Sequence, residues 1–126
     1  MAVNFVSKLK YDVSDLLEIM KILRSPEGCP WDREQTHESI KKSLIEETYE
    51  VVEAINKNDK ELMTEELGDV LLQVVFHSQI GAENGEFDFS DVCDGICKKL
   101  IERHPHVFGD ISVKDSGEVM ENWEQI

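Results

Sequence analysis

The stretch LIEETYEVVEAINKNDKELMTEELGD, residues 44–69, decides the fold because it joins two helical patterns through one short break. Before the break, apolar and acidic residues recur with the period of an amphipathic helix, which we expect from about residues 36–39 to Asn58. Asp59 can cap a second helix, which we expect to end near Ala82. Two long helices with a short connection predict an antiparallel pair.

Further helices are predicted on either side of this pair. Serine caps predict three of them, and these helices run from Ser14 to about Arg24, from Ser90 to about Arg103, and from Ser116 onward, still helical at Ile126. Segments rich in proline and glycine predict irregular connections, at 25–37, 83–87 and 104–110. No strand pattern appears, so we expect an all-α bundle of about four main helices over residues 12–126, after an N-terminal arm, 1–11.

Composition restricts the class of partner. The chain has 126 residues, the size of one domain, with 27 acidic against 13 basic side chains and a net charge of −14. Such a surface disfavours nucleic acid polymers and anionic membranes, which attract basic patches. No apolar run reaches the length of a membrane span, and neither a signal-peptide pattern nor a Cys-x-x-Cys pair occurs. We therefore expect a cytoplasmic protein with reduced thiols.

The first helix of the central pair carries its acids on one face. A helical count places Glu46, Glu47 and Glu50 close together and the aliphatic residues opposite them. A solvated acidic face explains this pattern without any function.

The second helix is less easily explained, because its apolar residues spread around almost the whole circumference. A helix of this kind is buried on most sides. Four polar side chains nevertheless share one stripe, namely Glu66, Asp69, Gln73 and His77. Buried charges are costly unless they are paired or coordinated, and a divalent cation would satisfy them. Gln73 and His77 fit either a hydrogen-bonded core or a place beside the metal.

The spacing of the acids suits a hard cation. Residues at i and i+3 project side by side, so Glu47 with Glu50 and Glu66 with Asp69 could surround one cavity. Carboxylate oxygens suit Mg²⁺ or Mn²⁺ better than zinc, and Mg²⁺ commonly shares its shell with phosphates. A di-iron bundle would need two Glu-x-x-His motifs, whereas the sequence has one, at 34–37. No EF-hand loop is present.

These residues resemble a known family. EETYE (46–50) followed by ELGD (66–69) resembles the EExxE…ExxD signature of MazG-type nucleoside triphosphate pyrophosphohydrolases. CPWDREQTHESI, EELGDVLLQVVFHSQI, FDFSDVC, KLIERHPHVFGD and ENWEQI are similar to MazG segments in the same order. The resemblance covers about residues 12–126.

The resemblance implies an all-α enzyme that assembles as a homodimer or homotetramer. It implies hydrolysis of an NTP or dNTP to the monophosphate and pyrophosphate with Mg²⁺, Mn²⁺ being an alternative. Carried over by motif, the metal ligands are Glu47, Glu50, Glu66 and Asp69. Glu46 is the catalytic candidate, because it could bind a second ion or orient the attacking water.

Five further residues are candidate substrate contacts. Lys99 and Arg103 match a KLxxR element and are expected at the phosphates, although a basic turn is also favourable at any helix C-terminus. Lys42 could reach the substrate or simply be a surface lysine. Trp123 matches an aromatic residue of the family and could stack on a base, as could Trp31, which could instead anchor a loop in the core.

One departure concerns the C-terminus. In the family pattern a lysine follows the Trp-x-x-Ile element, and here the chain stops at Ile126. We therefore expect a fragment of a longer protein. The alternative to an enzyme is a catalytically silent MazG-like module that serves oligomerisation or regulation.

Overall fold

The structure is a computed structural model that describes residues 3–125. These residues form seven helices and no strand, which confirms the all-α class. The helices are α1 (Val13–Leu23), α2 (Pro30–Glu34), α3 (His37–Asn56), α4 (Lys60–Glu83), α5 (Phe89–Arg103), α6 (Pro105–Phe108) and α7 (Ser116–Gln125). None of these helices is long and apolar enough to cross a membrane.

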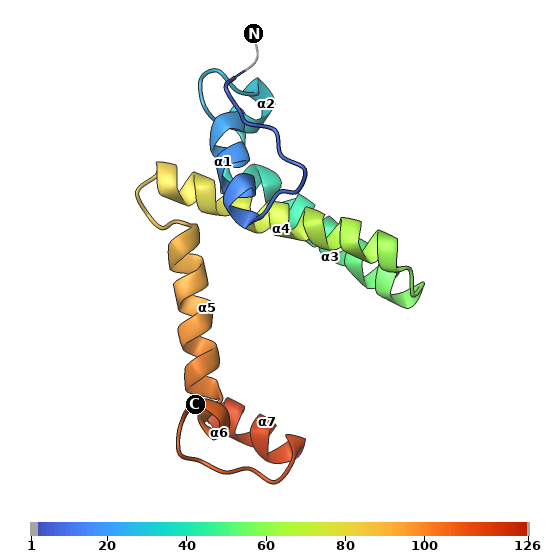
Figure 1. Cartoon of the computed structure of the whole chain (residues 1–126), viewed down its shortest axis with the longest axis vertical. Helices are drawn as coiled ribbons and strands as arrows, with labels where there is room; N and C mark the ends of the chain where they lie inside the picture. Colours follow the sequence, from blue (N-terminus) through green and yellow to red (C-terminus); the bar gives the residue numbers. More distant parts are fainter. Residues whose placement is uncertain (1–2, 126) are drawn as a thin grey trace. The chain divides into compact units, whose positions relative to one another are not determined.

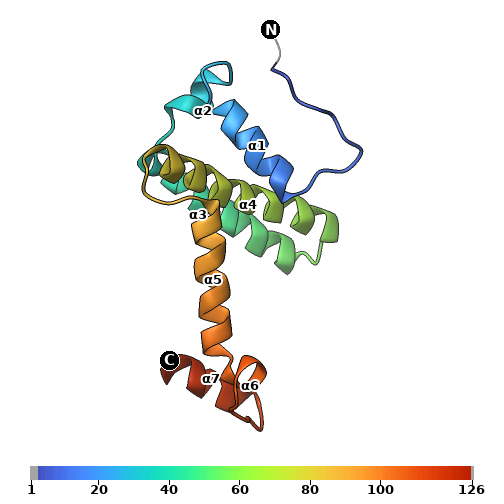
Figure 2. The same cartoon turned by 60° about the vertical axis from the view of Figure 1, so that its left-hand side comes forward.

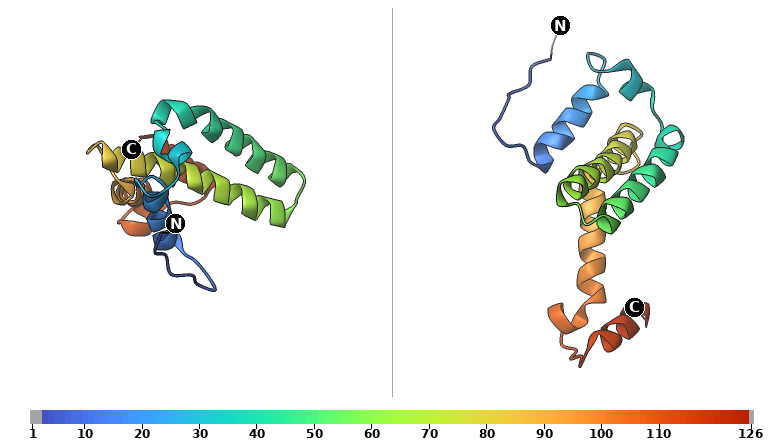
Figure 3. Two further views of the ribbon diagram at one scale, coloured as in Figure 1. Left: turned by 90° about the horizontal axis from the view of Figure 1, so that it is seen from above. Right: turned by 90° about the vertical axis from the view of Figure 1, so that its right-hand side faces the viewer.

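The chain divides between Asp88 and Phe89 into two compact units. In the first unit, α3 and α4 lie side by side and α1 packs against α4 (Figures 1 and 2). The pairing of α3 with α4 is also visible from above and from the side (Figure 3). The second unit consists of α5 to α7, and α6 packs against the end of α5.

The predicted antiparallel pair is confirmed, and its turn follows from the sequence NKND. Asn58 adopts a left-handed backbone conformation, with φ of 51°, which asparagine tolerates better than most residues. Its N–H and that of Asp59 donate to the carbonyl oxygens of Ile55 and Ala54 and so close α3. The Asp59 carboxylate then accepts from Leu62 N–H, at 3.1 Å, and begins α4 as predicted.

All three predicted serine caps are wrong, in each case by one or two residues. At α1 the cap is Asp12, which exchanges hydrogen bonds with Asp15 and begins the helix before Ser14. Ser90 lies inside the first turn of α5. Ser116 is already helical, because the Asp115 carboxylate accepts from Glu118 N–H at 3.0 Å. An ionised carboxylate is the stronger acceptor for the free N–H groups of a first turn. The predicted continuation through Ile126 lies outside the described residues.

The connection between α1 and α3 is fixed by Arg24. Its guanidinium donates to the carbonyl oxygens of Asp32 and Gln35 and pairs with both carboxylate oxygens of Glu83 on α4, each at 2.9 Å. It also lies over the ring of Phe76, 5.6 Å from the centroid. Arg24 thus joins the start of this connection to residues near its end, and the segment that was predicted to be irregular contains the short helix α2.

The core of the first unit lies between α1, α3 and the C-terminal half of α4. Its buried apolar residues are Met20, Ile40, Ala54, Val75, Phe76 and Ile80. In the N-terminal half of α4, Leu67 and Leu71 are 51% and 41% exposed. The expectation that this helix is buried on most sides is therefore wrong for the single chain, because α1 and α3 together do not cover it.

Candidate metal centre

Glu47 lies where α3 faces α4. The side chains of α3 with reduced exposure include Ile40, Leu44, Val51 and Ala54, which recur with the spacing of one helical face. Glu47 belongs to the same face and is half-buried. The acids were expected opposite the aliphatic residues of this helix, and that expectation is wrong for Glu47. A carboxylate in an interhelical seam needs a compensating partner, since burial disfavours its charge.

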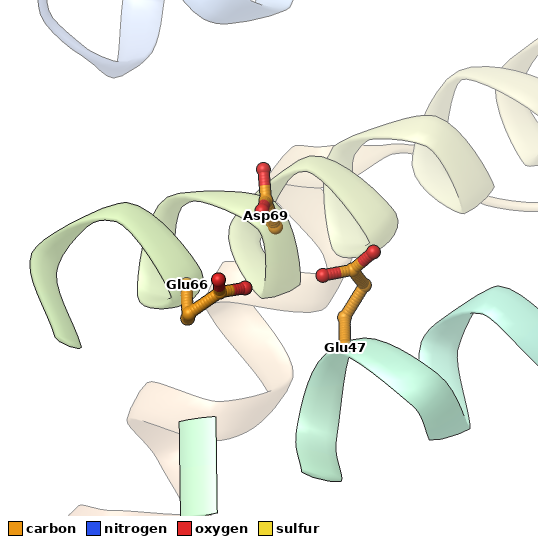
Figure 4. A group of neighbouring side chains, drawn as sticks. All are labelled: Glu47, Glu66 and Asp69. Atoms are coloured by element: carbon orange, nitrogen blue, oxygen red, sulfur yellow. The ribbon is translucent and has the colours of Figure 1, made fainter. Parts of the chain in front are cut away.

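Glu66 and Asp69 approach Glu47 from α4. All three side chains are half-buried, and one carboxylate oxygen from each lies within 4.8 Å of the others. Figure 4 shows the Glu47 side chain rising from α3 toward the two α4 residues. The i, i+3 spacing on α4 places its two acids on one face, and the short turn at Asn58 sets the register against α3.

The electrostatics of this group favour a cation. Partial burial raises the pKa of Glu47, and the charges of Asp69, Glu50 and Glu46 raise it further. Partial burial likewise raises the pKa of Glu66, with added repulsion from Asp69, Glu50 and Glu47. Mutual repulsion of ionised carboxylates is relieved by either protons or a metal ion, so the group has the charge distribution of a cation site.

The two remaining acids of the signature, Glu46 and Glu50, lie outside the close group of Glu47, Glu66 and Asp69. Glu50 is exposed and outside the close group, although its charge acts on Glu47 and Glu66. Glu46 is exposed and forms a loose surface pair with Lys42, at 3.8 Å. The structure thus brings together three of the four predicted ligands, with Glu50 one turn away on the same helix.

The donor set fits a hard divalent ion. It offers carboxylate oxygens, with no histidine or thiol in the group, and this chemistry is typical of Mg²⁺ and Mn²⁺ sites. One turn beyond Asp69, Gln73 is 8% exposed and its Oε1 is buried without a partner among the described residues. Such an oxygen is suited to accept a hydrogen bond from a water molecule beside the carboxylates.

Two candidate substrate residues lie at the surface of the first unit. Lys42 is 87% exposed at its side chain, and the ammonium group is next to Glu46. Trp31 on α2 is 60% exposed, so it does not anchor the loop in the core. A stacking role for Trp31 stays a prediction.

The other three candidates belong to the second unit. Lys99 is exposed on α5. The Arg103 guanidinium lies 5.3 Å from the Trp123 ring centroid and donates to the Trp123 carbonyl oxygen at 3.1 Å. His104 contacts the edge of the same indole ring. The residues predicted for phosphate and for base are therefore in direct contact, and Arg103 occupies one face of the proposed stacking surface.

A pair of histidines links the two helices of the site, and their contact was not predicted from the sequence. His37 on α3 and His77 on α4 are joined by a hydrogen bond between their Nδ1 atoms, at 2.8 Å. Local spacing cannot reveal a contact between residues 40 positions apart. The stripe formed by Glu66, Asp69, Gln73 and His77 was the available signal, because it indicated a polar face on α4.

Residues 35–108 match the MazG nucleotide pyrophosphohydrolase domain. The chain is 57% identical over 112 residues to a nucleoside triphosphate pyrophosphohydrolase/pyrophosphatase MazG of Thermotoga maritima, with 89% of this chain and 42% of the relative covered. It is 53% identical over 115 residues to a nucleoside triphosphate pyrophosphohydrolase of Escherichia coli K12, with 90% and 44% covered.

Two further comparisons concern length and fold. An uncharacterised protein of Bacillus subtilis, YabN, is 52% identical over 118 residues, which cover 94% of this chain and 24% of YabN. The chain thus spans from about a quarter to less than half of these three relatives. The crystal structure of a MazG-related protein from Thermotoga maritima superposes with a TM-score of 0.72 at 28% identity, covering 89% of this chain and 96% of that one.

Proposed function

The chain belongs to the MazG nucleotide pyrophosphohydrolase family, and we propose that it hydrolyses NTPs and dNTPs to the monophosphate and pyrophosphate with Mg²⁺. The observation that carries this proposal is the close group of Glu47, Glu66 and Asp69 in the seam between α3 and α4. Two relatives above 50% identity are named as nucleoside triphosphate pyrophosphohydrolases, which supports the hydrolysis of NTPs. The cellular role that we propose is housecleaning of the nucleotide pool.

The acidic residues have separate tasks in this proposal. Glu47, Glu66 and Asp69 would hold the cation, with Glu50 completing the set from one turn away. A bound divalent ion neutralises the triphosphate charge and lowers the pKa of water. Glu46 lies outside the close carboxylate group, and its exposed oxygens can orient the attacking water and accept its proton. Mn²⁺ should substitute, because it accepts the same oxygen ligands.

Cationic and aromatic residues would position the nucleotide. Lys99 and Lys42 present exposed ammonium groups that suit phosphate oxygens. Arg103 can use guanidinium N–H groups that do not donate to Trp123, while Trp123 offers the ring face away from Arg103 to a base. The exposed ring of Trp31 is a second stacking candidate.

Apolar exposure supports a homodimer or homotetramer. Helix α3 exposes Ile45, Tyr49 and Val52 by 47% to 72%, and α4 exposes Leu67 and Leu71. In the second unit, α5 has no buried residue within its described length. Surfaces of this composition are typical of subunit interfaces. The three free cysteines agree with the reducing cytoplasm that we propose as its location.

The test is pyrophosphate release from a panel of canonical and modified NTPs and dNTPs, with Mg²⁺ or with EDTA. The proposal expects release with Mg²⁺ and none with EDTA. Absence of release from every substrate would favour the catalytically silent module. Equal release with EDTA would contradict the metal assignment while leaving the activity standing.

A further inference from the structure

The histidine pair joins the start of α3 to the C-terminal half of α4. His37 is the first residue of α3, just after the Thr36 cap, and His77 lies in the C-terminal half of α4. Glu47 follows His37 by ten residues, about 15 Å along the helix axis, and Asp69 precedes His77 by eight, about 12 Å. The acidic group therefore lies between the Asn58 turn at one end and the histidine pair at the other.

The rings are packed as well as hydrogen-bonded. The His37 and His77 centroids are 5.1 Å apart with nearly parallel planes, and the Phe87 ring stacks on His37 at 6.0 Å. Gly81 makes room for Phe87, because a Cβ at this glycine would lie 2.8 Å from the phenyl ring. The start of α3 is thus held against α4 by a specific contact and not by apolar packing alone.

The hydrogen bond constrains the protons of the pair. Between two Nδ1 atoms one must donate and the other accept, so one proton is shared at this contact. Two neutral rings satisfy the rule in opposite tautomers, and one added proton is tolerated. Protonation of both rings places a proton on each Nδ1, which removes the bond and brings two positive charges together.

The surroundings of His77 favour its neutral form. Burial lowers the pKa of His77, and the neighbouring His37 lowers it further. An imidazolium at His77 would also carry an N–H at Nε2, which is buried without a partner among the described residues.

Other charged groups near the pair are already compensated or solvated. Arg24, the residue that follows α1, lies over Phe76 and is paired with Glu83 of α4. Glu86 and Asp88 flank Phe87 in the chain and are exposed. Two neutral rings in opposite tautomers satisfy the contact between the Nδ1 atoms, and burial favours the neutral form of His77.

We propose that His37 and His77 are positioning residues, whose shared proton fixes the start of α3 on α4 and thereby sets the spacing between Glu47 and the Glu66–Asp69 pair. The proposal rests on the metal-dependent function proposed above. Neither histidine touches the carboxylate group, so their effect is on the geometry that binds the cation. Loss of the hydrogen bond should weaken metal binding without removing a ligand.

The first test is the tautomeric state in the intact 126-residue chain, read by long-range ¹H–¹⁵N NMR of its four histidines. We expect one ring of the pair to carry its proton on Nδ1 and the other on Nε2 at neutral pH. Two Nε2-protonated rings that titrate like solvent-exposed histidine would overturn the proposal. This readout is independent of activity and needs no variant.

The second test uses Mg²⁺-dependent thermal stabilisation of three variants. His37→Phe keeps the ring packing but removes the hydrogen bond, and we expect about a tenfold higher Mg²⁺ midpoint, the lower end of the range for residues that contact metal ligands directly. His37→Asn places an amide N–H near the original Nδ1 and should restore the wild-type midpoint. His106→Phe, in the second unit, is the matched control and should also match wild type.

The outcomes separate the two proposals. A wild-type midpoint in His37→Phe, or failure of His37→Asn to rescue, would overturn the positioning role even if the enzyme is active. If wild type released no pyrophosphate yet showed the opposite tautomers and the tenfold shift in His37→Phe, the proposed function would fail and the positioning of the metal site would stand. If His37→Phe did not fold, the tautomers and His37→Asn would decide.

Discussion

Arg24 should contribute more to the free energy of unfolding than an exposed cationic side chain does, and the Arg24→Ala variant tests this directly. Its side chain is 6% exposed, and its guanidinium makes two hydrogen bonds to Glu83 and two to carbonyl oxygens in the α1–α3 connection. A hydrogen bond to a charged group contributes about 1.5–3 kcal/mol when its loss leaves the partner dry. The Glu83 side chain is 37% exposed and can be hydrated, so its share is about 1 kcal/mol or less. We therefore expect Arg24→Ala to cost about 2–4 kcal/mol.

Urea unfolding followed by helical circular dichroism measures this loss. Lys21→Ala is the matched control, because Lys21 is an exposed cation in the last turn of the same helix. Glu83→Gln isolates the ion pair and should cost about 1 kcal/mol or less. Arg24 holds the pKa of Glu83 below its ordinary value of 4.5. The stabilisation that the folded state gains from this ion pair is therefore complete above pH 4.5 and is lost as the pH falls below it. A loss in Arg24→Ala equal to that in Lys21→Ala would refute the reasoning.

Three further predictions concern the acidic group and Gly28. Because the pKa values of Glu47 and Glu66 are raised above the ordinary 4.5, the metal-free site should become less destabilising as the pH falls from neutral toward 4.5. Thermal melts in EDTA should show Glu47→Gln more stable than wild type near pH 7, with the difference shrinking in acid. Protons compete with the metal over the same range, so the Mg²⁺ midpoint of wild type should rise as the pH falls. Gly28→Ala should cost about 2 kcal/mol or more in urea unfolding, since its Cβ would collide with the carbonyl groups of Ile22 and Leu23. A stable Gly28→Ala protein would show that this connection rearranges easily.

The local elements of the fold could be predicted from the sequence because their causes are local. The turn at Asn58 and the cap at Asp59 lie in four consecutive residues, and the helical period on either side is long. The serine caps failed because an aspartate one or two residues earlier offered a stronger acceptor, as Asp12 and Asp115 do. Caps compete, and a single-residue rule does not weigh the competitors.

The candidate site was predictable where it depends on spacing within one helix. The i, i+3 pattern correctly placed Glu66 beside Asp69. On α3, helical spacing places Glu47 on the face of Leu44 and Val51, so grouping it with the solvated acids was the mistake, and it is half-buried against α4. The histidine pair and the Arg24 contacts join residues far apart in the chain, so they depend on tertiary packing that no local pattern encodes.

The most direct test of the central claim is pyrophosphate release by wild type and Asp69→Asn in the same Mg²⁺ series. Asparagine preserves the size of the side chain and removes the charge, so a normal helical spectrum would exclude a folding defect. If the carboxylate group is the metal centre, wild type releases pyrophosphate with Mg²⁺ and the folded variant releases almost none. Near wild-type release by Asp69→Asn would contradict the assignment of the site.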